Sequence, residues 1–490
     1  MAIPVDTFFL DPGFDGTLQQ QIQQRVTEGV LTGVLRPRER MPSSRKLAQH
    51  LGISRITVTL AYTELVANDY LVSRGRSGYF VSDNAPSPPN FELAPRPRQD
   101  KVDWSRALGQ RYAGYADVIR PPDWRSYRYP FIYGQADMRL FDHQNWRLCA
   151  VRALGQRDFE AMTLDRYEQD DPQLVEFILR NILPRRGISA RPQEILITMG
   201  AQNALWLAAQ ILLTQRRKAA MEYPCYPGLR EILAQTRCGT VSVDVDDEGL
   251  PPEALPDDID VVFTTPSHHC PTNVTMPIDR RHQLLQMAAE RQFIVVEDDY
   301  EFEMSFGRSP KPALKSLDDS GHVIYIGSFS KSLFPGLRLG YVVASEVFIR
   351  EARALRSLIL RHPPGHIQRT AAYFLSQGHY DSQIKRMGQA YHKRRAVMEQ
   401  ALLNHHLIGT DAATAGGSSF WLKAPRGTDT AQLALSLRDK GVLIEPGHVF
   451  FGSERPAQRH YRLAYSSIPS ERIPDGIAVI AESLRASGPN

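Results

Sequence analysis

The chain has 490 residues, of which 42% are hydrophobic and 23% are charged. These fractions are typical of soluble globular proteins and argue against a disordered or fibrous chain. No apolar run approaches the about 20 residues that a membrane-spanning helix needs, and residues 1–10 lack the features of a secretory signal. We therefore expect a cytoplasmic protein that does not bind a membrane, and the length predicts two or three domains.

The cysteine and histidine residues do not predict a metal centre. Four cysteines lie far apart, without the C-x-x-C pairing of a disulfide frame or a structural zinc site. His268, His269 and Cys270 are adjacent, but neighbouring side chains on a strand point to opposite faces and do not easily share one ion. We expect reduced thiols, no metal, and a polar pocket wall at the two histidines.

The first part of the chain predicts a DNA-binding head. Residues 17–32 carry apolar residues four positions apart, which predicts an amphipathic helix. Two further helices of about 44–51 and 54–68 are each preceded by a capping serine and are separated by a tight turn at Gly52. This pair has the pattern of a helix-turn-helix, whose second helix enters a DNA major groove. The segment 70–82 alternates around glycines and predicts a two-stranded wing.

Charge and motif both support this interpretation of the head. Residues 36–76 hold eight arginine and lysine residues against three acidic residues, an excess of +5 that suits phosphate contacts. The segment resembles the winged-helix domain of the GntR family, with Arg38 at the position of a usual glycine. The resemblance implies DNA contacts from Arg45, Arg55, Thr57, Arg74 and Gly75. Any one of these arginines alone is more often a solvated charge, but the whole pattern favours double-stranded DNA.

The rest of the chain predicts a connector and a large α/β body. Five prolines in residues 83–100 indicate an extended linker. Short runs that are apolar on both faces predict parallel strands covered by helices, at 194–199, 260–265, 293–298, 322–328 and 341–345. Strand-like patterns at 418–424 and 459–467 predict a smaller α+β lobe. We place the domains as follows: head 12–83, linker 84–125, body 126–490, with lobes of about 145–375 and 376–490.

The segment G-S-F-S-K-S-L-F-P-G-L-R-L-G, residues 327–340, has the chemistry of a pyridoxal phosphate site. Lys331 can form a Schiff base with an aldehyde. Ser328 and Ser330 can donate to a phosphate, and Arg338 can match the charge of that phosphate in a bidentate manner. The segment T-M-G-A-Q-N-A, residues 198–204, adds the backbone N–H groups of a helix start to the same phosphate, from Ala201 and Gln202.

Three more positions complete the predicted pocket. Asp298, at the end of a strand, can hold a pyridine nitrogen protonated, and Tyr300 can donate to the ring oxygen. Tyr226, in a loop bracketed by prolines, offers a flat face for stacking, and Arg462 is a candidate clamp for an effector carboxylate. Each residue alone is more often a surface or packing residue. Four such motifs in this order, each beside a strand end, favour the cofactor.

The body resembles fold type I aminotransferases, and the full length resembles the MocR/GabR-type regulators of the GntR family. The resemblance implies pyridoxal phosphate on Lys331 and the roles given above for the other site residues. It also implies a head-to-tail homodimer that switches genes when an amine or amino acid displaces Lys331 from its aldimine. The predicted function is therefore a regulator that senses an amine and controls genes for its catabolism, not a working enzyme.

Two departures, one from the aminotransferase pattern and one from the GABA-responsive regulator, bear on this prediction. The usual N-P-T-G is replaced by Cys270-Pro271-Thr272-Asn273, which removes an asparagine that would touch the ring oxygen and disfavours efficient transamination. Gly228 stands where the GABA-responsive regulator has an arginine, so GABA is not the favoured effector. The segments 167–177 and 267–272 resemble those of the subgroup that governs taurine or ectoine catabolism.

Two alternatives remain beside the regulator. The first is a catalytically competent aminotransferase that its head tethers to DNA, because the core catalytic residues are retained. The second treats Ser328-x-x-Lys331 as the S-x-x-K of a penicillin-binding hydrolase, but the S-D-N and K-T-G companions are absent and the motif follows a strand.

Overall fold

The computed structural model describes residues 2–86, 102–109, 112, 120–135, 137–165, 167–304, 311–409, 417–452 and 459–486. The chain divides into two compact units, Met1–Arg111 and Tyr112–Asn490, which we call the head and the body. Most of the predicted linker, including four of the five prolines in residues 83–100, lies outside the described residues.

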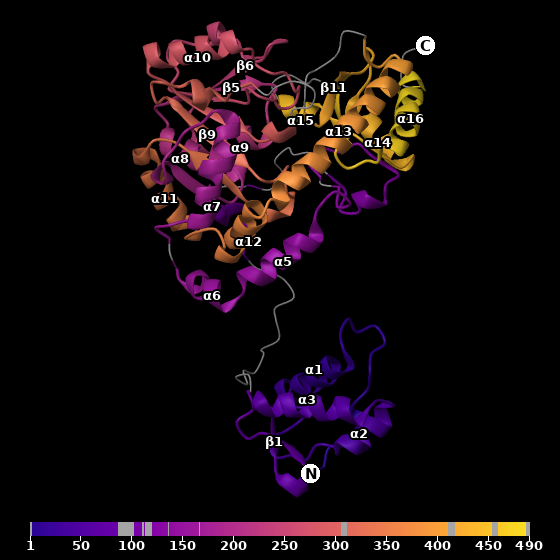
Figure 1. The fold of residues 1–490 in the computed structure, drawn as a ribbon. Helices are drawn as coiled ribbons and strands as arrows, with labels where there is room; N and C mark the ends of the chain where they lie inside the picture. The colour runs from indigo at the N-terminus through magenta and orange to yellow at the C-terminus, as the bar shows by residue number, and fades with distance from the viewer. Residues whose placement is uncertain are drawn as a thin grey trace. The chain divides into compact units, whose positions relative to one another are not determined.

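The head is the predicted winged helix-turn-helix (Figure 1). It contains α1 (Leu18–Leu31), α2 (Ser44–Leu51) and α3 (Arg55–Ala67), followed by an antiparallel pair of β1 (Leu71–Ser73) and β2 (Tyr79–Val81). Ser43 caps α2 by accepting a hydrogen bond from the backbone N–H of Lys46, and Gly52 ends α2 in the left-handed conformation with φ 67°. The three helices and the wing enclose one apolar core that includes Val26, Leu47, Val58, Tyr62 and Val81.

A seven-stranded sheet forms the centre of the body, with strand order β4-β10-β9-β8-β7-β5-β6. The strands are β4 (Ile195–Thr198), β5 (Lys218–Tyr223), β6 (Gly239–Asp244), β7 (Val261–Thr264), β8 (Ile294–Asp299), β9 (Val323–Ser328) and β10 (Gly340–Val343). Helices α8 (Ala201–Leu212), α9 (Pro227–Thr236) and α11 (Glu346–Leu360) pack on one face. Helix α10 (Ile278–Arg291) and helices α7 (Pro172–Phe177) and α12 (Gly365–Ser376) pack on the other.

The sheet differs from the prediction in two respects. Strand β10 runs antiparallel to both of its neighbours, β4 and β9, whereas all five predicted runs were expected to be parallel. The segment between β9 and β10 spans only residues 329–339, which is too short for the crossover that a parallel neighbour needs. The prediction also missed β5 and β6. Strand β5 begins K-A-A-M and holds residues of low strand propensity, and β6 is an edge strand with an exposed side.

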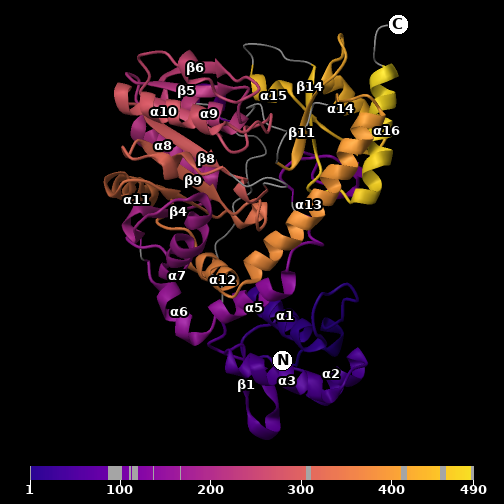
Figure 2. The same cartoon turned by 45° about the horizontal axis from the view of Figure 1, so that its top comes forward.

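The smaller lobe forms a second core (Figure 2). Strands β11 (Ser419–Lys423), β14 (His460–Ala464) and β13 (Glu445–Pro446) form an antiparallel sheet, and β12 (Val442–Leu443) pairs with β3 (Tyr129–Pro130). Helices α14 (Thr430–Asp439), α15 (His448–Phe451) and α16 (Ile473–Ala486) belong to this lobe. Helix α13 (His379–Asn404) connects the lobes, because its Tyr380 packs in the larger core and its Met398 in the smaller one. Both strands predicted for this lobe are confirmed.

Helices α4 (Trp104–Ala107), α5 (His143–Ala153) and α6 (Gln156–Thr163) complete the described helices. No helix within the described ranges combines the length and the apolar character needed to cross a membrane.

A buried carboxylate fastens helix α11 to strand β4. Asp170 Oδ2 accepts hydrogen bonds from the Ile197 N–H (3.1 Å) and from Arg353 Nη1 (2.9 Å), and Asp170 Oδ1 accepts from Arg356 Nη1 (2.6 Å). Arg356 is fully buried, and burial lowers its pKa although Asp170 favours its charged form. Removing Asp170 would leave a buried charge without its partner, the costly case for a buried ion pair.

We therefore expect Asp170→Ala to lower the free energy of unfolding of the body by about 3–5 kcal/mol. Thermal and urea unfolding of the full chain, followed by tryptophan fluorescence, measures this change. Glu346→Gln serves as the control because Glu346 is exposed and pairs with Arg191 at 3.9 Å; it should cost less than about 1 kcal/mol. Equal losses in the two variants would contradict the assignment.

Candidate functional site

Strand β10 brings the two predicted phosphate-binding motifs together. Gly340, its first residue, is the register partner of Thr198 at the end of β4 and of Ser328 at the end of β9. The loops that follow β4 and β9 therefore start on either side of one glycine. A side chain on Gly340 would meet the backbone of Gly200 at 3.0 Å and the carbonyl of Gly327 at 2.9 Å, so only glycine allows this approach.

Arg338 lies against the N-terminus of α8. Gly200 caps this helix with φ 83°, and a Cβ atom there would come within 3.2 Å of Arg338 Nη2. The same nitrogen donates to the carbonyl of Met199 (3.0 Å). Ala201 and Gln202 are the first residues of α8, as predicted. The N–H groups at this helix start and the exposed guanidinium of Arg338 therefore lie next to each other. Positive helix dipole and guanidinium together favour a bound phosphate.

Lys331 follows β9 and lies among aromatic and charged groups. Its Nζ is 4.0 Å from the centroid of the Tyr133 ring, and a Cβ atom on Gly134 would come within 2.2 Å of it. Burial lowers the pKa of Lys331 to about 8, although Glu301 and Glu445 favour its charged form. A substantial neutral fraction near pH 8 is what an amine needs to attack a carbonyl. The serines of this motif lie beside it, with the Ser330 N–H donating to Ser328 Oγ (3.2 Å).

Asp298 and Tyr300 lie at the end of β8, beside β9. Oδ1 of Asp298 is buried and has no hydrogen-bond partner among the described residues. Burial raises the pKa of Asp298 to about 7, with Asp299 and Glu222 acting in the same direction. A buried acceptor without a donor is costly unless a bound group supplies one. Tyr300 donates from its hydroxyl to the carbonyl of His268 (2.9 Å).

Tyr226 precedes α9 and shares a cavity with Asp298 and Cys270. Its ring lies over Gly228, where an added Cβ atom would come within 2.6 and 2.7 Å of two ring carbons and within 2.8 Å of the hydroxyl oxygen. Glycine at position 228 is therefore required for this orientation of the Tyr226 ring. An arginine there would displace the ring as well as add a charge.

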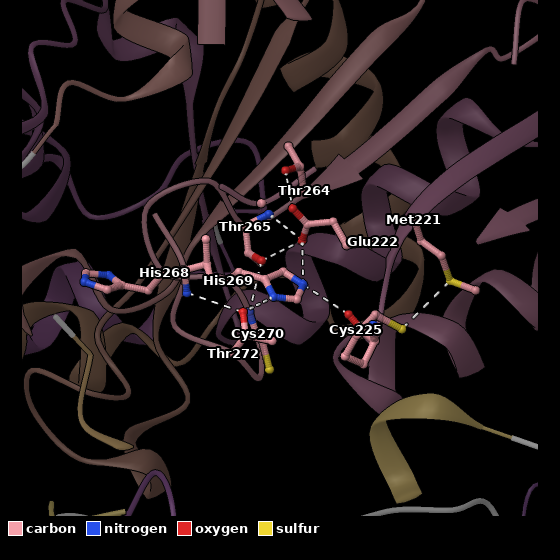
Figure 3. A network of polar contacts seen from close by, with 12 residues as sticks. Met221, Glu222, Cys225, Thr264, Thr265, His268, His269, Cys270 and Thr272 are labelled. Atoms are coloured by element: carbon pink, nitrogen blue, oxygen red, sulfur yellow. Dashed lines mark hydrogen bonds and ion pairs between the residues drawn. The ribbon is translucent and has the colours of Figure 1, made fainter. Parts of the chain in front are cut away.

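A network of polar contacts lies beneath this cavity (Figure 3). Glu222, at the end of β5, accepts from the hydroxyls of Thr264 and Thr265, both at 2.6 Å. His269 stands 3.6 Å from Glu222 and contacts Thr272 Oγ1 (2.7 Å). Figure 3 shows His268 pointing away from this network. In the part of the chain that the structure describes, no group of three or more potential ligands is arranged to hold a metal ion.

The segment that replaces N-P-T-G keeps a left-handed residue at its last position, but it has Cys270 in place of the asparagine. Asn273 adopts the left-handed conformation with φ 62° and donates from Nδ2 to the carbonyl of Ser419 (2.6 Å). Cys270 is buried at the position of the missing asparagine, and burial raises the pKa of its thiol to about 11. The position of the missing asparagine is therefore occupied by a neutral thiol.

Arg462 is buried and shares one carboxylate with a second arginine. Its Nε donates to Glu445 Oε2 (2.8 Å), its register partner across the β13–β14 pair. Arg120 Nη2 donates to Glu445 Oε1 (3.3 Å), which also accepts from the Tyr133 N–H (3.1 Å). The Arg462 guanidinium lies 4.1 Å from the Tyr133 ring centroid, so Tyr133 contacts both Arg462 and Lys331. Two arginines therefore share one carboxylate near Lys331, and Glu301, which accepts from the Tyr133 hydroxyl (3.0 Å), is a second acidic group beside the same lysine.

Sequence reasoning missed four residues of this site: Tyr133, Gly134, Glu445 and Arg120. Glu445 stands opposite Arg462 in a pair of short strands, and β13 has only two residues, which is too few for a periodic signal. Arg120 and Tyr133 come from the segment that was assigned to the linker and the start of the body. The pair Tyr133-Gly134 in F-I-Y-G was the one available signal, because a glycine after an apolar run often allows a close approach.

The residues predicted to contact DNA lie on the head as expected from their elements. Arg45 is on the first turn of α2, and Arg55 begins α3 with its Nε 3.4 Å from Ser44 Oγ. Thr57 is half-buried on α3. Arg74 stacks on the Phe80 ring at 4.8 Å, and Gly75 turns the wing with φ 55°. Their contacts with DNA remain predictions.

Comparison with known proteins identifies the family. Residues 150–480 match the family of class I and II aminotransferases, and residues 18–81 match the gntR family of bacterial regulatory proteins. The chain is 58% identical over 486 residues to the HTH-type transcriptional regulator TauR of Rhodobacter capsulatus, covering 99% of this chain and 100% of TauR. The chain is a MocR-type regulator of the GntR family.

Further comparisons agree with this assignment of a MocR-type regulator. The protein MocR of Rhizobium meliloti is 29% identical over 98% of this chain and 95% of its own length. Among solved structures, the α-aminoadipate aminotransferase LysN from Thermus thermophilus has a TM-score of 0.70 and 26% identity, over 79% of this chain and 99% of LysN. The predicted family and both predicted folds are confirmed.

Glu445, the carboxylate that Arg462 and Arg120 share, allows a test of the electrostatics in this MocR-type site. Glu445 favours the charged form of Lys331, so Glu445→Gln should lower the pKa of Lys331 below its value of about 8. A larger neutral fraction then makes Lys331 react about two- to fivefold faster with acetic anhydride at pH 7. Competitive acetylation across a pH series, read by mass spectrometry of the Lys331 peptide in the cofactor-free chain, measures this pKa.

Glu346→Gln, which changes an exposed carboxylate, is the matched control and should leave the Lys331 titration unchanged. A Lys331 pKa that stays constant or rises in Glu445→Gln contradicts the assigned coupling.

Proposed function

We propose that the body binds pyridoxal phosphate and uses it to sense a primary amine that carries an anionic group, and that the head binds double-stranded DNA in response. The observation that carries this proposal is the convergence of Lys331, Asp298 and the Arg338–α8 cradle. The MocR-type family supports the regulatory role, because TauR and MocR are named as regulators.

The residues present fit the cofactor. Pyridoxal phosphate, when bound, supplies an aldehyde that condenses with primary amines. The buried Oδ1 of Asp298 lacks a donor, which a protonated pyridine nitrogen would provide. Arg338 with the α8 N-terminus would hold the phosphate, and the Tyr226 ring offers a face for stacking. Lys331 provides the amine.

The charge of the site supports an anionic group on the effector. Arg462 and Arg120 both pair with the single carboxylate of Glu445, so each guanidinium is only partly neutralised and can attract an anionic group. Arg462 is the candidate for holding the anion, because its Nε alone is used by Glu445 at 2.8 Å. The resemblance of residues 267–272 to the taurine and ectoine subgroup, together with the 58% identity to TauR, makes taurine the first amine to test.

Sensing is favoured over catalysis by the loss of the asparagine at Cys270. A neutral, buried thiol cannot donate the strong hydrogen bond that stabilises charge on the ring oxygen during transamination. The second candidate function, a competent aminotransferase, is supported by the retention of Lys331, Asp298 and Tyr300 in an aminotransferase fold. Repeated turnover with a keto acid would favour this second candidate.

We propose further that the chain acts in the cytoplasm as a head-to-tail homodimer. Exposed apolar side chains on neighbouring elements support a partner surface: Leu148, Val151, Leu154, Phe159, Leu358 and Ile359. The end of α11 lies beside the segment after α6, because Arg361 contacts Asp165 at 3.6 Å and the Tyr167 ring at 5.8 Å. Apolar side chains gathered on neighbouring surface elements favour contact with a second copy of the chain.

A titration with matched ligands tests the sensing role. Taurine should change the affinity of the cofactor-loaded chain for its DNA at least about fivefold, while ethanesulfonate, which lacks the amine, should not. The change should disappear in Lys331→Arg, which keeps the positive charge but cannot condense with the aldehyde. Fluorescence anisotropy with a duplex selected by the full chain measures the affinity, and absorbance spectra monitor the cofactor in parallel.

An equal response of Lys331→Arg and the native chain to taurine would refute sensing through this lysine. A chain that stays colourless with pyridoxal phosphate would refute the cofactor assignment. If other primary amines act and taurine does not, only the choice of taurine is wrong.

A further inference from the structure

The outer face of α3 is apolar. Val58, Ala61, Tyr62 and Leu65 point into the head and are buried. With 3.6 residues per turn, the opposite side of the helix carries Ile56 and Leu60. Ile56 is 71% exposed and Leu60 is 49% exposed, although both are large hydrophobic residues.

The threonines beside them add no free hydroxyl donors to this face. Thr59 Oγ1 donates to the carbonyl of Arg55 (2.9 Å), and Thr63 Oγ1 donates to the carbonyl of Thr59 (2.9 Å). Each hydroxyl proton is therefore used inside the helix. The middle of the outer face presents aliphatic carbon and weak acceptors, so it cannot form the donor pairs on which hydrogen-bonded base recognition depends.

Positive charge lies on α3 and on the elements next to it. Arg45 and Lys46 on α2, Arg55 at the start of α3 and Arg74 and Arg76 in the wing are all exposed. The one acidic side chain on α3, Glu64, accepts hydrogen bonds from Gln19 (3.0 Å) and Gln23 (2.7 Å). Exposed apolar side chains on α3 with cationic side chains on the neighbouring elements suit a nucleic-acid groove, where phosphates border the base edges.

From these observations we infer that Ile56 and Leu60 read thymine, by packing against its C5-methyl group in the major groove. This inference rests on the proposed function of the head in DNA binding. In an unmethylated duplex, thymine is the one base that presents a methyl group in that groove. Guanine is read by paired donors and adenine by a donor and an acceptor, and neither set is available at Ile56 or Leu60.

Removing single methyl groups from the DNA tests the inference. The full chain, loaded with pyridoxal phosphate, first selects its preferred duplexes from an unmethylated random pool. Each thymine of the selected half-site is then replaced by deoxyuridine, which lacks only the C5-methyl group. We expect one or two positions in each half-site at which this replacement weakens binding about three- to tenfold, as burial of one methyl group predicts.

Variants of the helix assign the loss to the two side chains. In Ile56→Ala and Leu60→Ala, the deoxyuridine penalty at the contacted position should fall to less than about twofold, while Ile56→Leu should retain it. Leu31→Ala is the matched control, because Leu31 is an exposed apolar residue of α1 and should keep the native penalty. Thermal unfolding checks that the variants fold, and exposed positions should change stability little.

The outcomes separate this inference from the proposed function. If the full chain selects no DNA at all, DNA binding by the head fails. If it selects DNA but no thymine shows a penalty with deoxyuridine, thymine reading fails while DNA binding stands. A penalty that persists unchanged in both alanine variants also overturns the inference, because another part of the head then contacts the methyl group.

Discussion

The insertion of β10 between β4 and β9 is the constraint on which the site depends. The phosphate motifs that follow β4 and β9 are more than 120 residues apart in the sequence, and β10 joins both strands through hydrogen bonds. Because β10 starts at Gly340, the loop ends approach closely enough for Arg338 to contact the cap of α8. Lys331 lies in the same loop as Arg338, so its amine is placed by this connection too.

The parts of the fold that could be predicted are those with local signals. Helix caps at Ser43 and Ser54, the left-handed Gly52 and the apolar strand runs are properties of short segments, and the structure has each of them. The antiparallel direction of β10 could also have been predicted, because the segment after Ser328 is too short for a parallel crossover. The apolar pattern alone led to the prediction of a parallel strand. Strand β5 could not be predicted because its start is rich in alanine, which has a low strand propensity. The strand is buried by its neighbours on both sides, and its own sequence does not show this.

The residues of the site also fall into those with a local sequence signal and those without one. Lys331, Asp298 and Arg338 stand in motifs at strand ends, where sequence order indicates position in the sheet. Glu445 became visible only through its register with Arg462, because pairing across two short strands leaves no trace in either segment alone. The apolar face of α3 was also missed, because the sequence pattern alone does not separate the exposed Ile56 and Leu60 from the buried apolar residues of the same helix.

Through Glu445, the charges inside the body affect Arg120, which lies near the start of the body. Arg120 lies far from the buried Arg462 in the sequence, yet both guanidinium groups share one carboxylate. An anion bound to Arg462 would weaken the pairing of Arg462 with Glu445. The carboxylate of Glu445 would then interact more strongly with Arg120. The start of the body and the pocket therefore share one carboxylate, so a change of charge beside Arg462 would alter how strongly Glu445 holds Arg120.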